Sequence, residues 1–444
     1  MKLNILLLIA LLLPGATITA NAASRHSTRY VITDFGAVAD GATVNTRAIQ
    51  SAIDKCAASG GGVVVVPQGT FLSGAIFLKQ GVNLQVEKDG VLKGTTNPDD
   101  YPQIQTRWEG TEEMWTSAFI NAEGVTGLEI YGDGTIDGSG EEWVQKNPFR
   151  RQRPPAAPGD APAATPVPPT AARPPMGGPQ RRGRPRLIGI QNSQHVHITG
   201  LNLHNQAVWC LFILYSEDVL ADNLRITAEH NIPSSDGIDI DSSRHVHINH
   251  VYIDDDDDCI SIKSGKDADG LRVNRPAEDI LIENSHFAYG EGGVAMGSET
   301  SGGIRNVMVR HCIFDSGNWA PIRFKTQPSR SGVVENITYR DITLHQTRQA
   351  FEFNMAWRMV PPVAPPAKVL PVVKNVKIVN VSGDVQSAGN IQGLEGSPIR
   401  GIIFKNTHIT AQTGLKLEHV RDVDMKGLTL DVKQGPPVTK SDAE

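Results

Sequence analysis

The stretches His195-Val196-His197-Ile198 and His245-Val246-His247-Ile248 are two clear copies of a short pattern that returns along most of the chain. Each copy has a polar residue, an apolar and usually β-branched residue, any residue, and a second apolar residue. With the second residue as an anchor, the copies fall at positions 196, 219, 246, 280, 307, 337, 376, 402 and 423. The spacings between anchors are 23, 27, 34, 27, 30, 39, 26 and 21 residues, and fainter copies stand at Leu84 and Leu128.

The step of two between apolar residues within a copy is typical of a β-strand. An irregular period in the twenties and thirties is typical of a solenoid whose loops vary in length. Leucine-rich repeats have similar periods, but their leucine signature is absent, and so is the helical spacing that ankyrin-type repeats need. The pattern therefore predicts an all-β fold, a single-stranded right-handed parallel β-helix whose strands stack at about 4.8 Å.

A solenoid needs a cover on its open end, and the segment 45–58 supplies a helical cap at the N-terminus. Its apolar residues fall on one helical face: Ala48, Ile49, Ala52, Ile53 and Cys56. Three glycines at 60–62 end the predicted helix, and a buried strand follows at 63–66. At the other end, residues 434–444 are predicted to form a loose tail.

The composition fits this fold and excludes one class of partner. The chain has 444 residues with 43 glycines, which favours a turn-rich β protein over a helical bundle. An elongated repeat fold grows lengthwise, so this length does not require several domains. The formal net charge is −6, which argues against a nucleic-acid partner. The four cysteines, at 56, 210, 259 and 312, have spacings unlike a disulfide scaffold or a zinc site, and we expect at most one disulfide bridge.

Two segments are set apart from the repeat. Residues 1–22 have a basic start, a short apolar run and an Ala20-Asn21-Ala22 cleavage site, which predicts a signal peptide and a periplasmic or secreted protein without a membrane anchor. Residues 148–186 contain twelve prolines and eight arginines and are predicted to be a disordered insertion. It is either a tolerated surface loop or a basic arm that attracts an acidic polymer. The rest of 23–444 is predicted to be one domain.

Acidic residues return at the spacing of one turn of the solenoid. Asp236 is followed 22 residues later by Asp258, at the end of the acidic run 254–258, and Glu291 comes 33 residues after that. Arg323 and Lys325 arrive another turn on. An EF-hand starting at position 254 would need Gly at 259 and Glu at 265, and the chain has Cys and Gly there. A solvated acidic corner is the alternative, but it does not explain the return of charge on each turn. Closely placed carboxylates with one raised pKa suit glycoside hydrolysis.

Six stretches carry a resemblance to a known family. They are 34–41 (DFGAVADG), 132–138 (GDGTIDG), 236–240 (DGIDI), 257–265 (DDCISIKSG), 292–299 (GGVAMGSE) and 323–326 (RFKT). In this order and spacing the chain resembles the polygalacturonases, glycoside hydrolase family twenty-eight, over nearly all of its mature length. The resemblance implies a β-helical catalytic domain over 23–444. It also implies inverting, metal-independent hydrolysis of α-linked galacturonan, with no cofactor.

The same resemblance assigns roles to residues of this sequence. Asp257 would be the general acid, Asp236 and Asp258 would hold and activate water, and Arg323 and Lys325 would bind a substrate carboxylate. The partner would be an acidic plant cell-wall polysaccharide or oligosaccharide, and we expect a monomer.

The motifs depart from the family pattern at three places. Ser234-Ser235 stands where Asn-Thr is usual, Asp256 where Gln or Gly is usual, and Glu291 where the family has a histidine. Glu291 should raise the pKa of Asp257 if the two lie close. It is a candidate catalytic residue that takes over a proton-handling role, and the alternatives are contact with a sugar hydroxyl of a different substrate or loss of activity. Strict strand alternation would point Asp257 and Asp258 to opposite sides, so a bend is needed to bring both into one site.

Three other functions stay open. They are hydrolysis of rhamnogalacturonan or another pectic glycan, a calcium-dependent lyase, and a carbohydrate-binding β-helix that has lost catalysis.

Overall fold

The computed structural model describes residues 28–146, 183–358 and 364–443. The predicted signal peptide at 1–22 lies outside the described residues, and so does most of the insertion predicted at 148–186. The prediction was wrong at the end of that insertion, because Arg186 is the first residue of a strand and is buried. Its guanidinium carbon lies 3.9 Å from the ring centroid of Phe212, so cation–π contact orders this end.

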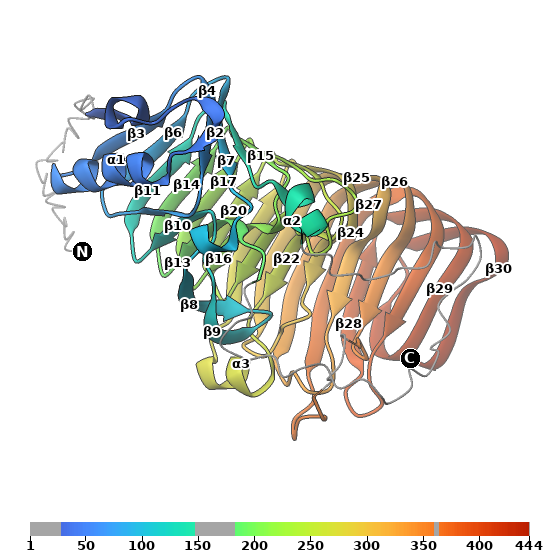
Figure 1. Cartoon of the computed structure of the whole chain (residues 1–444). Coiled ribbons are helices and arrows are strands. Elements are labelled where there is room, and N and C mark those ends of the chain that lie inside the picture. The colour runs from blue at the N-terminus through green and yellow to red at the C-terminus, as the bar shows by residue number, and fades with distance from the viewer. Residues whose placement is uncertain (1–27, 147–182, 359–363, 444) are drawn as a thin grey trace, which may run out of the picture.

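The molecule is a right-handed parallel β-helix that runs from the helix α1 (Thr46–Ala58) at one end to the last strand β30 (Leu428–Ala443) at the other (Figure 1). In the part of the chain that the structure describes, twenty-eight strands pair in parallel within one continuous sheet, and β8 and β9 pair antiparallel as a separate hairpin. The other helices are α2 (Gly140–Lys146), α3 (Asp267–Val273) and the 3-10 turns η1 (Ile32–Phe35) and η2 (Pro98–Asp100).

The strands of the N-terminal half are β1 (Arg29–Val31), β2 (Asp40–Val44), β3 (Gly62–Val66), β4 (Gly69–Ser73), β5 (Ile76–Leu78), β6 (Val82–Val86), β7 (Gly90–Gly94), β8 (Gln103–Trp108), β9 (Thr111–Thr116), β10 (Ile120–Glu123), β11 (Thr126–Tyr131), β12 (Thr135–Asp137), β13 (Arg186–Gln191), β14 (Gln194–Thr199), β15 (Asn202–His204), β16 (Val208–Leu214), β17 (Glu217–Asp222) and β18 (Arg225–Thr227). Those of the C-terminal half are β19 (Ile238–Asp241), β20 (Arg244–Asn249), β21 (Tyr252–Asp254), β22 (Asp258–Lys263), β23 (Ala277–Glu283), β24 (His286–Met296), β25 (Ile304–Lys325), β26 (Val333–Asn354), β27 (Val372–Gln392), β28 (Ile399–Lys405), β29 (Thr407–Asp424) and β30.

The sequence repeat sets the register of the stacked turns. Each predicted anchor from 196 to 423 is the direct strand partner of the next, as in the series Val196, Val219, Val246, Ile280 and Val307. Position 128 also pairs with 196, whereas position 84 pairs with 130, two residues away from the predicted partner. The repeat therefore predicted the winding of the chain correctly over all but its first turns.

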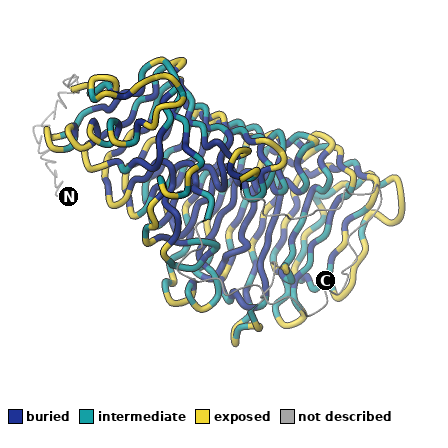
Figure 2. Tube along the Cα trace, viewed as in Figure 1, coloured by how far each residue is buried: buried dark blue, intermediate teal, exposed yellow. Residues whose placement is uncertain are grey.

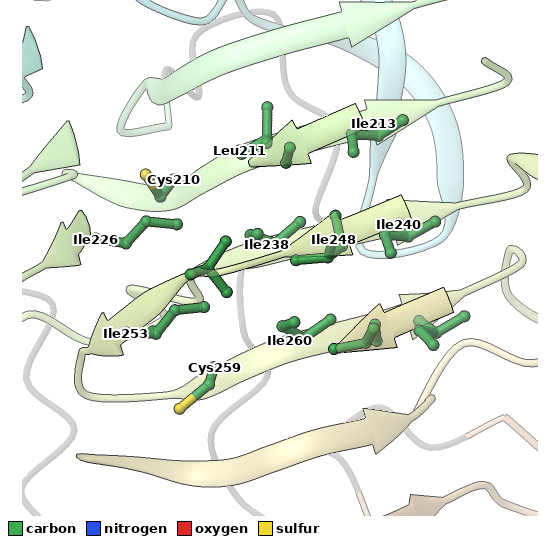
Figure 3. Packing of buried hydrophobic residues seen from close by; sticks show 14 of the residues in the cluster. Cys210, Leu211, Ile213, Ile226, Ile238, Ile240, Ile248, Ile253, Cys259 and Ile260 are labelled. Carbon is green, nitrogen blue, oxygen red and sulfur yellow. The ribbon is translucent and has the colours of Figure 1, made fainter. Parts of the chain in front are cut away.

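The interior consists of apolar side chains stacked on one another from turn to turn (Figure 3). Leu211, Ile238 and Ile260 are successive strand partners, and all three have no exposed surface. Each buried aliphatic side chain contributes about 1.5–3 kcal/mol, so the long interior supplies the main stabilisation. Figure 2 shows this buried interior running through the length of the molecule, with exposed residues at the loops. All four cysteines lie buried and unpaired, so the expected upper limit of one disulfide is met with none.

The polar residue before each anchor has a conformational role. His245, Asp279, Asn306 and Asn336 all have φ between 53° and 58°, the left-handed region that Asn, Asp and His tolerate best. Their side chains also connect successive turns, since the Asn306 amide donates to Asp279 at 2.9 Å and the Asn336 amide donates to Asn306 at 3.2 Å. The polar residue of the repeat therefore makes the sharp corner that starts each anchor strand.

The N-terminal cap of the solenoid was predicted correctly, and the C-terminal end was not. Helix α1 covers the N-terminal end, with Ile49, Ala52, Ile53 and Cys56 buried, as predicted. The loose tail predicted at 434–444 was wrong over 434–443, because this segment continues β30 and pairs with β29. Backbone pairing with an open strand edge does not depend on apolar side chains, so the polar sequence did not reveal it. No helix within the described ranges combines the length and the apolar character needed to cross a membrane.

Candidate active site

The three predicted aspartates meet on one face of the solenoid. Asp236 precedes β19, Asp257 precedes β22, and Asp258 is the first residue of β22. One carboxylate oxygen from each lies within 4.8 Å of one from each of the others, close enough for one water molecule to contact all three. The bend that this requires lies at position 257, where the backbone N–H of Asp258 donates to the Asp257 carboxylate at 2.9 Å.

Asp258 is held between two cations. Its Oδ1 accepts from Arg323 Nη1 at 3.2 Å, and its Oδ2 accepts from Lys325 Nζ. Burial alone would raise the pKa of Asp258, but the charges of Lys325 and Arg323 outweigh it and hold this pKa below its usual range. Gly292 on the next turn makes room for this cluster, because a Cβ there would lie 2.3 Å from Asp258 Oδ1. Asp258 is therefore the ionised member of the site.

Asp257 differs from Asp258 in charge state, because it is about half protonated at neutral pH. Burial raises its pKa, and the carboxylates of Asp258 and Glu291 raise it further, to about 7, against the opposing charges of Lys325 and Arg323. The backbone N–H of Glu291 donates to the Asp257 carbonyl at 2.7 Å, so the two residues are neighbours on adjacent turns. The expectation that Glu291 raises the pKa of Asp257 is confirmed in its direction.

Asp236 lies on the other side, against a third cation. Its Oδ2 is 3.6 Å from Lys263 Nζ, and Asp239 Oδ1 is 2.6 Å from the same nitrogen. Burial raises the pKa of Asp236 well above its usual range, and the charges of Asp239 and Asp257 add to this effect. The surroundings of Asp236 therefore favour its protonated form more than those of Asp258 do.

The sequence of this chain matches two family models. Glycosyl hydrolases family 28 matches residues 177–428, which contain every candidate site residue, and a rhamnogalacturonase A/epimerase, pectate lyase-like model matches residues 29–151. The chain belongs to glycosyl hydrolases family 28. It is thus a glycoside hydrolase of polygalacturonase type, as the sequence motifs predicted.

Named relatives of this family 28 protein cover nearly all of it. A probable polygalacturonase of Vitis vinifera is 28% identical over 94% of this chain and 81% of its own length. An exo-poly-alpha-D-galacturonosidase of Dickeya chrysanthemi is 25% identical over 90% of this chain and 70% of its own length. The crystal structure of an exopolygalacturonase from Thermotoga maritima has a TM-score of 0.73 and 27% identity, and the match covers 91% of this chain and 92% of that one.

The family 28 site contains residues that the motif assignments left out. One row of strand partners carries them across the sheet: Phe212, Asp239, Ser261, Ala295, Arg323 and Glu352. Glu352 Oε2 lies 2.6 Å from Arg323 Nε, and the Trp357 ring centroid lies 5.0 Å from the Arg323 guanidinium. Asp239 and Lys263 lie within the motifs at 236–240 and 257–265, so their charges could have marked them as site residues. Trp357 follows β26 without any pattern that marks it.

Asp255 is a further buried acid behind the site, and it has no exposed surface. Burial raises its pKa well above the usual range, and the charges of Asp257, Asp258 and Asp254 raise it further, while the backbone N–H of Asp257 opposes them. Its carboxyl lies between two glycines of adjacent turns, because a Cβ at Gly237 or at Gly290 would approach it to 3.0 or 3.3 Å. Burial and the neighbouring carboxylates therefore favour the neutral form of Asp255.

Replacing Asp255 by Asn is expected to stabilise the protein as the pH rises. Because folding raises the pKa of Asp255, its contribution to stability is complete below the unfolded-state pKa and is lost as the pH increases toward the folded-state pKa. An amide stays neutral throughout, so Asp255→Asn should raise the free energy of unfolding at pH 8 and change it little at pH 4. Urea unfolding at both pH values measures this, with exposed Asp384→Asn as the control. An equal gain at both pH values would mean that Asp255 does not bind a proton on folding.

Proposed function

We propose that this protein hydrolyses α-linked galacturonan, with Asp257 as general acid and Asp258 as the base that activates water. The observation that carries the proposal is the split between these neighbours: the pKa of Asp257 is raised to about 7, while that of Asp258 is held low by Lys325 and Arg323. Two carboxyl groups with opposed protonation states are what a glycosidase needs near neutral pH.

Arg323 and Lys325 give the site its preference for an acidic sugar. Both are nearly buried, and both lie beside the ionised Asp258 at the centre of the site. Each keeps N–H donors beyond those used on Asp258, and a guanidinium next to an ammonium suits a carboxylate on the sugar at the scissile bond. A neutral glycan would offer these buried donors only hydroxyl oxygens, which are weaker acceptors than a carboxylate.

Inversion of the anomeric centre is proposed because both oxygens of Asp258 are already engaged by cations. These oxygens accept hydrogen bonds from Arg323 and Lys325, and burial favours the protonated form of Asp236, so neither aspartate is well placed to bond covalently to the sugar. Water held by Asp236 and Asp258 is the nucleophile instead. Proton NMR of the first product should show the β anomer from an α-linked substrate, and initial release of the α anomer would contradict inversion.

Hydrolysis is proposed to proceed without a metal ion, since Lys325 and Arg323 neutralise Asp258 where a cation would otherwise bind. Incubation with polygalacturonate should release reducing ends at the same rate with and without a chelator. A calcium-dependent lyase would instead form an unsaturated uronide that absorbs ultraviolet light and would stop when the chelator is added. No turnover together with retained oligosaccharide binding would identify a carbohydrate-binding β-helix.

Rhamnogalacturonan is the second candidate substrate, because the rhamnogalacturonase-like model matches residues 29–151. Parallel assays on both polymers decide between them.

We also propose that the protein is secreted, with a signal peptide at 1–22 and a mature, monomeric domain over 23–444. N-terminal sequencing of the exported protein tests the cleavage site, and its mass in solution tests the monomer.

The pH dependence should reveal the role of Glu291. With Asp257 as the acid, kcat/KM should fall about tenfold per pH unit above pH 7, since only protonated Asp257 is active. Glu291→Gln removes a charge that raises the pKa of Asp257, so its alkaline limb should move to lower pH and its activity at pH 8 should drop about threefold. The exposed Glu129→Gln is the control. An unchanged alkaline limb in Glu291→Gln would show that Glu291 does not act on the acid.

A further inference from the structure

We infer that a stack of three tryptophans closes the site on its N-terminal side, so that the enzyme removes sugars from the end of a galacturonan chain. The inference rests on the proposed function and adds the mode of attack to it. Its main element is the hairpin of β8 and β9, which no sequence motif marked.

The site residues fix the direction in which a bound polymer runs. Asp236, Asp258 and Arg323 come from the turns of β19, β22 and β25, which stack in that order with β24 between the last two. Neighbouring strands are about 4.8 Å apart. A sugar chain that contacts Asp236 and Arg323 therefore lies across the strands, along the axis of the solenoid.

The outward face of the sheet opens toward the C-terminus and closes toward the N-terminus. Beyond Arg323 the row of strand partners continues with Glu352 and Asn390, both half-buried, and then Lys416, which is exposed. In the opposite direction the next partner of Asp239 is Phe212, which is only 2% exposed although it is directed away from the interior core. As far as the described residues extend, a polymer can therefore continue only on the C-terminal side of the site.

Tryptophan rings fill the closed side. Trp115 stacks on Trp108 with centroids 4.5 Å apart, and Trp108 stacks on Trp209 with centroids 4.7 Å apart. Both faces of Trp108 are covered, so no sugar ring can enter between them. Trp209 and Phe212 form a second hydrophobic cluster outside the core, with Trp108 packed against it.

Little room separates this stack from the reacting groups. Lys263 Nζ lies 3.8 Å from the Trp209 ring centroid and 3.6 Å from Asp236 Oδ2, so a single side chain spans the interval. Because Lys263 contacts both, no room is left for a run of sugars between Asp236 and the tryptophans. The expected product is the monosaccharide.

The hairpin is a fixed wall because polar contacts hold it along four turns. The Gln105 carbonyl accepts from Gln191 at 3.2 Å, buried Arg107 pairs with Asp241 at 2.7 Å, and the Gly110 carbonyl accepts from Lys266 N–H at 2.9 Å. Glu112 adds a bond to the Tyr215 hydroxyl at 2.6 Å. Figure 1 shows β8, β9 and α3 together beside the stacked strands.

The first test is the product profile of the wild-type protein on polygalacturonate, followed by anion-exchange chromatography and viscosity. Galacturonic acid should be the main product from the earliest time, with little loss of viscosity per bond cleaved. Early oligosaccharides of mixed length with a steep fall in viscosity would overturn the inference while supporting the proposed function. If no galacturonan is hydrolysed, the proposed function itself fails.

A second test removes the middle of the stack. Trp108→Ala should open the closed side and at least double the share of oligosaccharides among early products. Met114→Ala, at a position on the same hairpin that is 52% exposed, should keep the wild-type profile. Circular dichroism confirms that both variants fold. A Trp108→Ala protein that folds and still releases only monosaccharide would assign the closure to other residues.

Discussion

Replacing Asp257 by Asn is expected to lower kcat by about 10²- to 10⁴-fold, because the variant has no proton to give to the leaving oxygen. The side chain keeps its shape, and the lost charge cannot destabilise a site in which Asp257 is already half protonated at neutral pH. Release of reducing ends measures turnover, and calorimetry with a galacturonan oligosaccharide measures binding, which should change little.

The control for Asp257→Asn is Asp133→Asn. Asp133 belongs to the motif at 132–138, which is far from the site residues in sequence. This substitution should leave kcat unchanged. Full activity in Asp257→Asn would remove the general acid from this position and leave Glu291 as the remaining candidate.

Replacing Arg107 by Met is expected to destabilise the protein by about 3–5 kcal/mol, since it leaves a buried carboxylate without its partner. Arg107 Nη1 lies 2.7 Å from Asp241 Oδ1, and the two side chains are 0% and 2% exposed. The methionine side chain retains most of the volume of arginine, so the loss in free energy of unfolding measures the effect of removing the charge. Denaturant unfolding gives the free energy.

A matched surface pair separates burial from charge. Arg29 and Glu87 lie 2.6 Å apart with side chains 48% and 38% exposed, so Arg29→Met should cost at most about 1 kcal/mol. A similar small loss in Arg107→Met would show that the hairpin is held by its tryptophans and not by this ion pair.

The sequence predicted the turns of the solenoid and the meeting of Asp236, Asp257 and Asp258, because both depend on spacing along the chain. Apolar anchors that must stack at one strand spacing also determine where the intervening acids come together. Asp255 could not be separated from its neighbours in the acidic run, since which of five adjacent aspartates points inward depends on the local bend. The wall at Trp108 depends on how a hairpin folds back over turns far ahead in sequence, and no periodicity encodes that contact.

The row of left-handed corners on the surface has a consequence for how the protein can vary. Solvent-exposed positions usually tolerate substitution, yet valine or isoleucine at Asp279, Asn306 or Asn336 would have to adopt a conformation that costs about 1–2 kcal/mol per residue. Because each side chain also bonds to the next, neighbouring losses would accumulate. In a mutational scan, this exposed line should therefore accept few residue types, and accessibility alone would mispredict its tolerance.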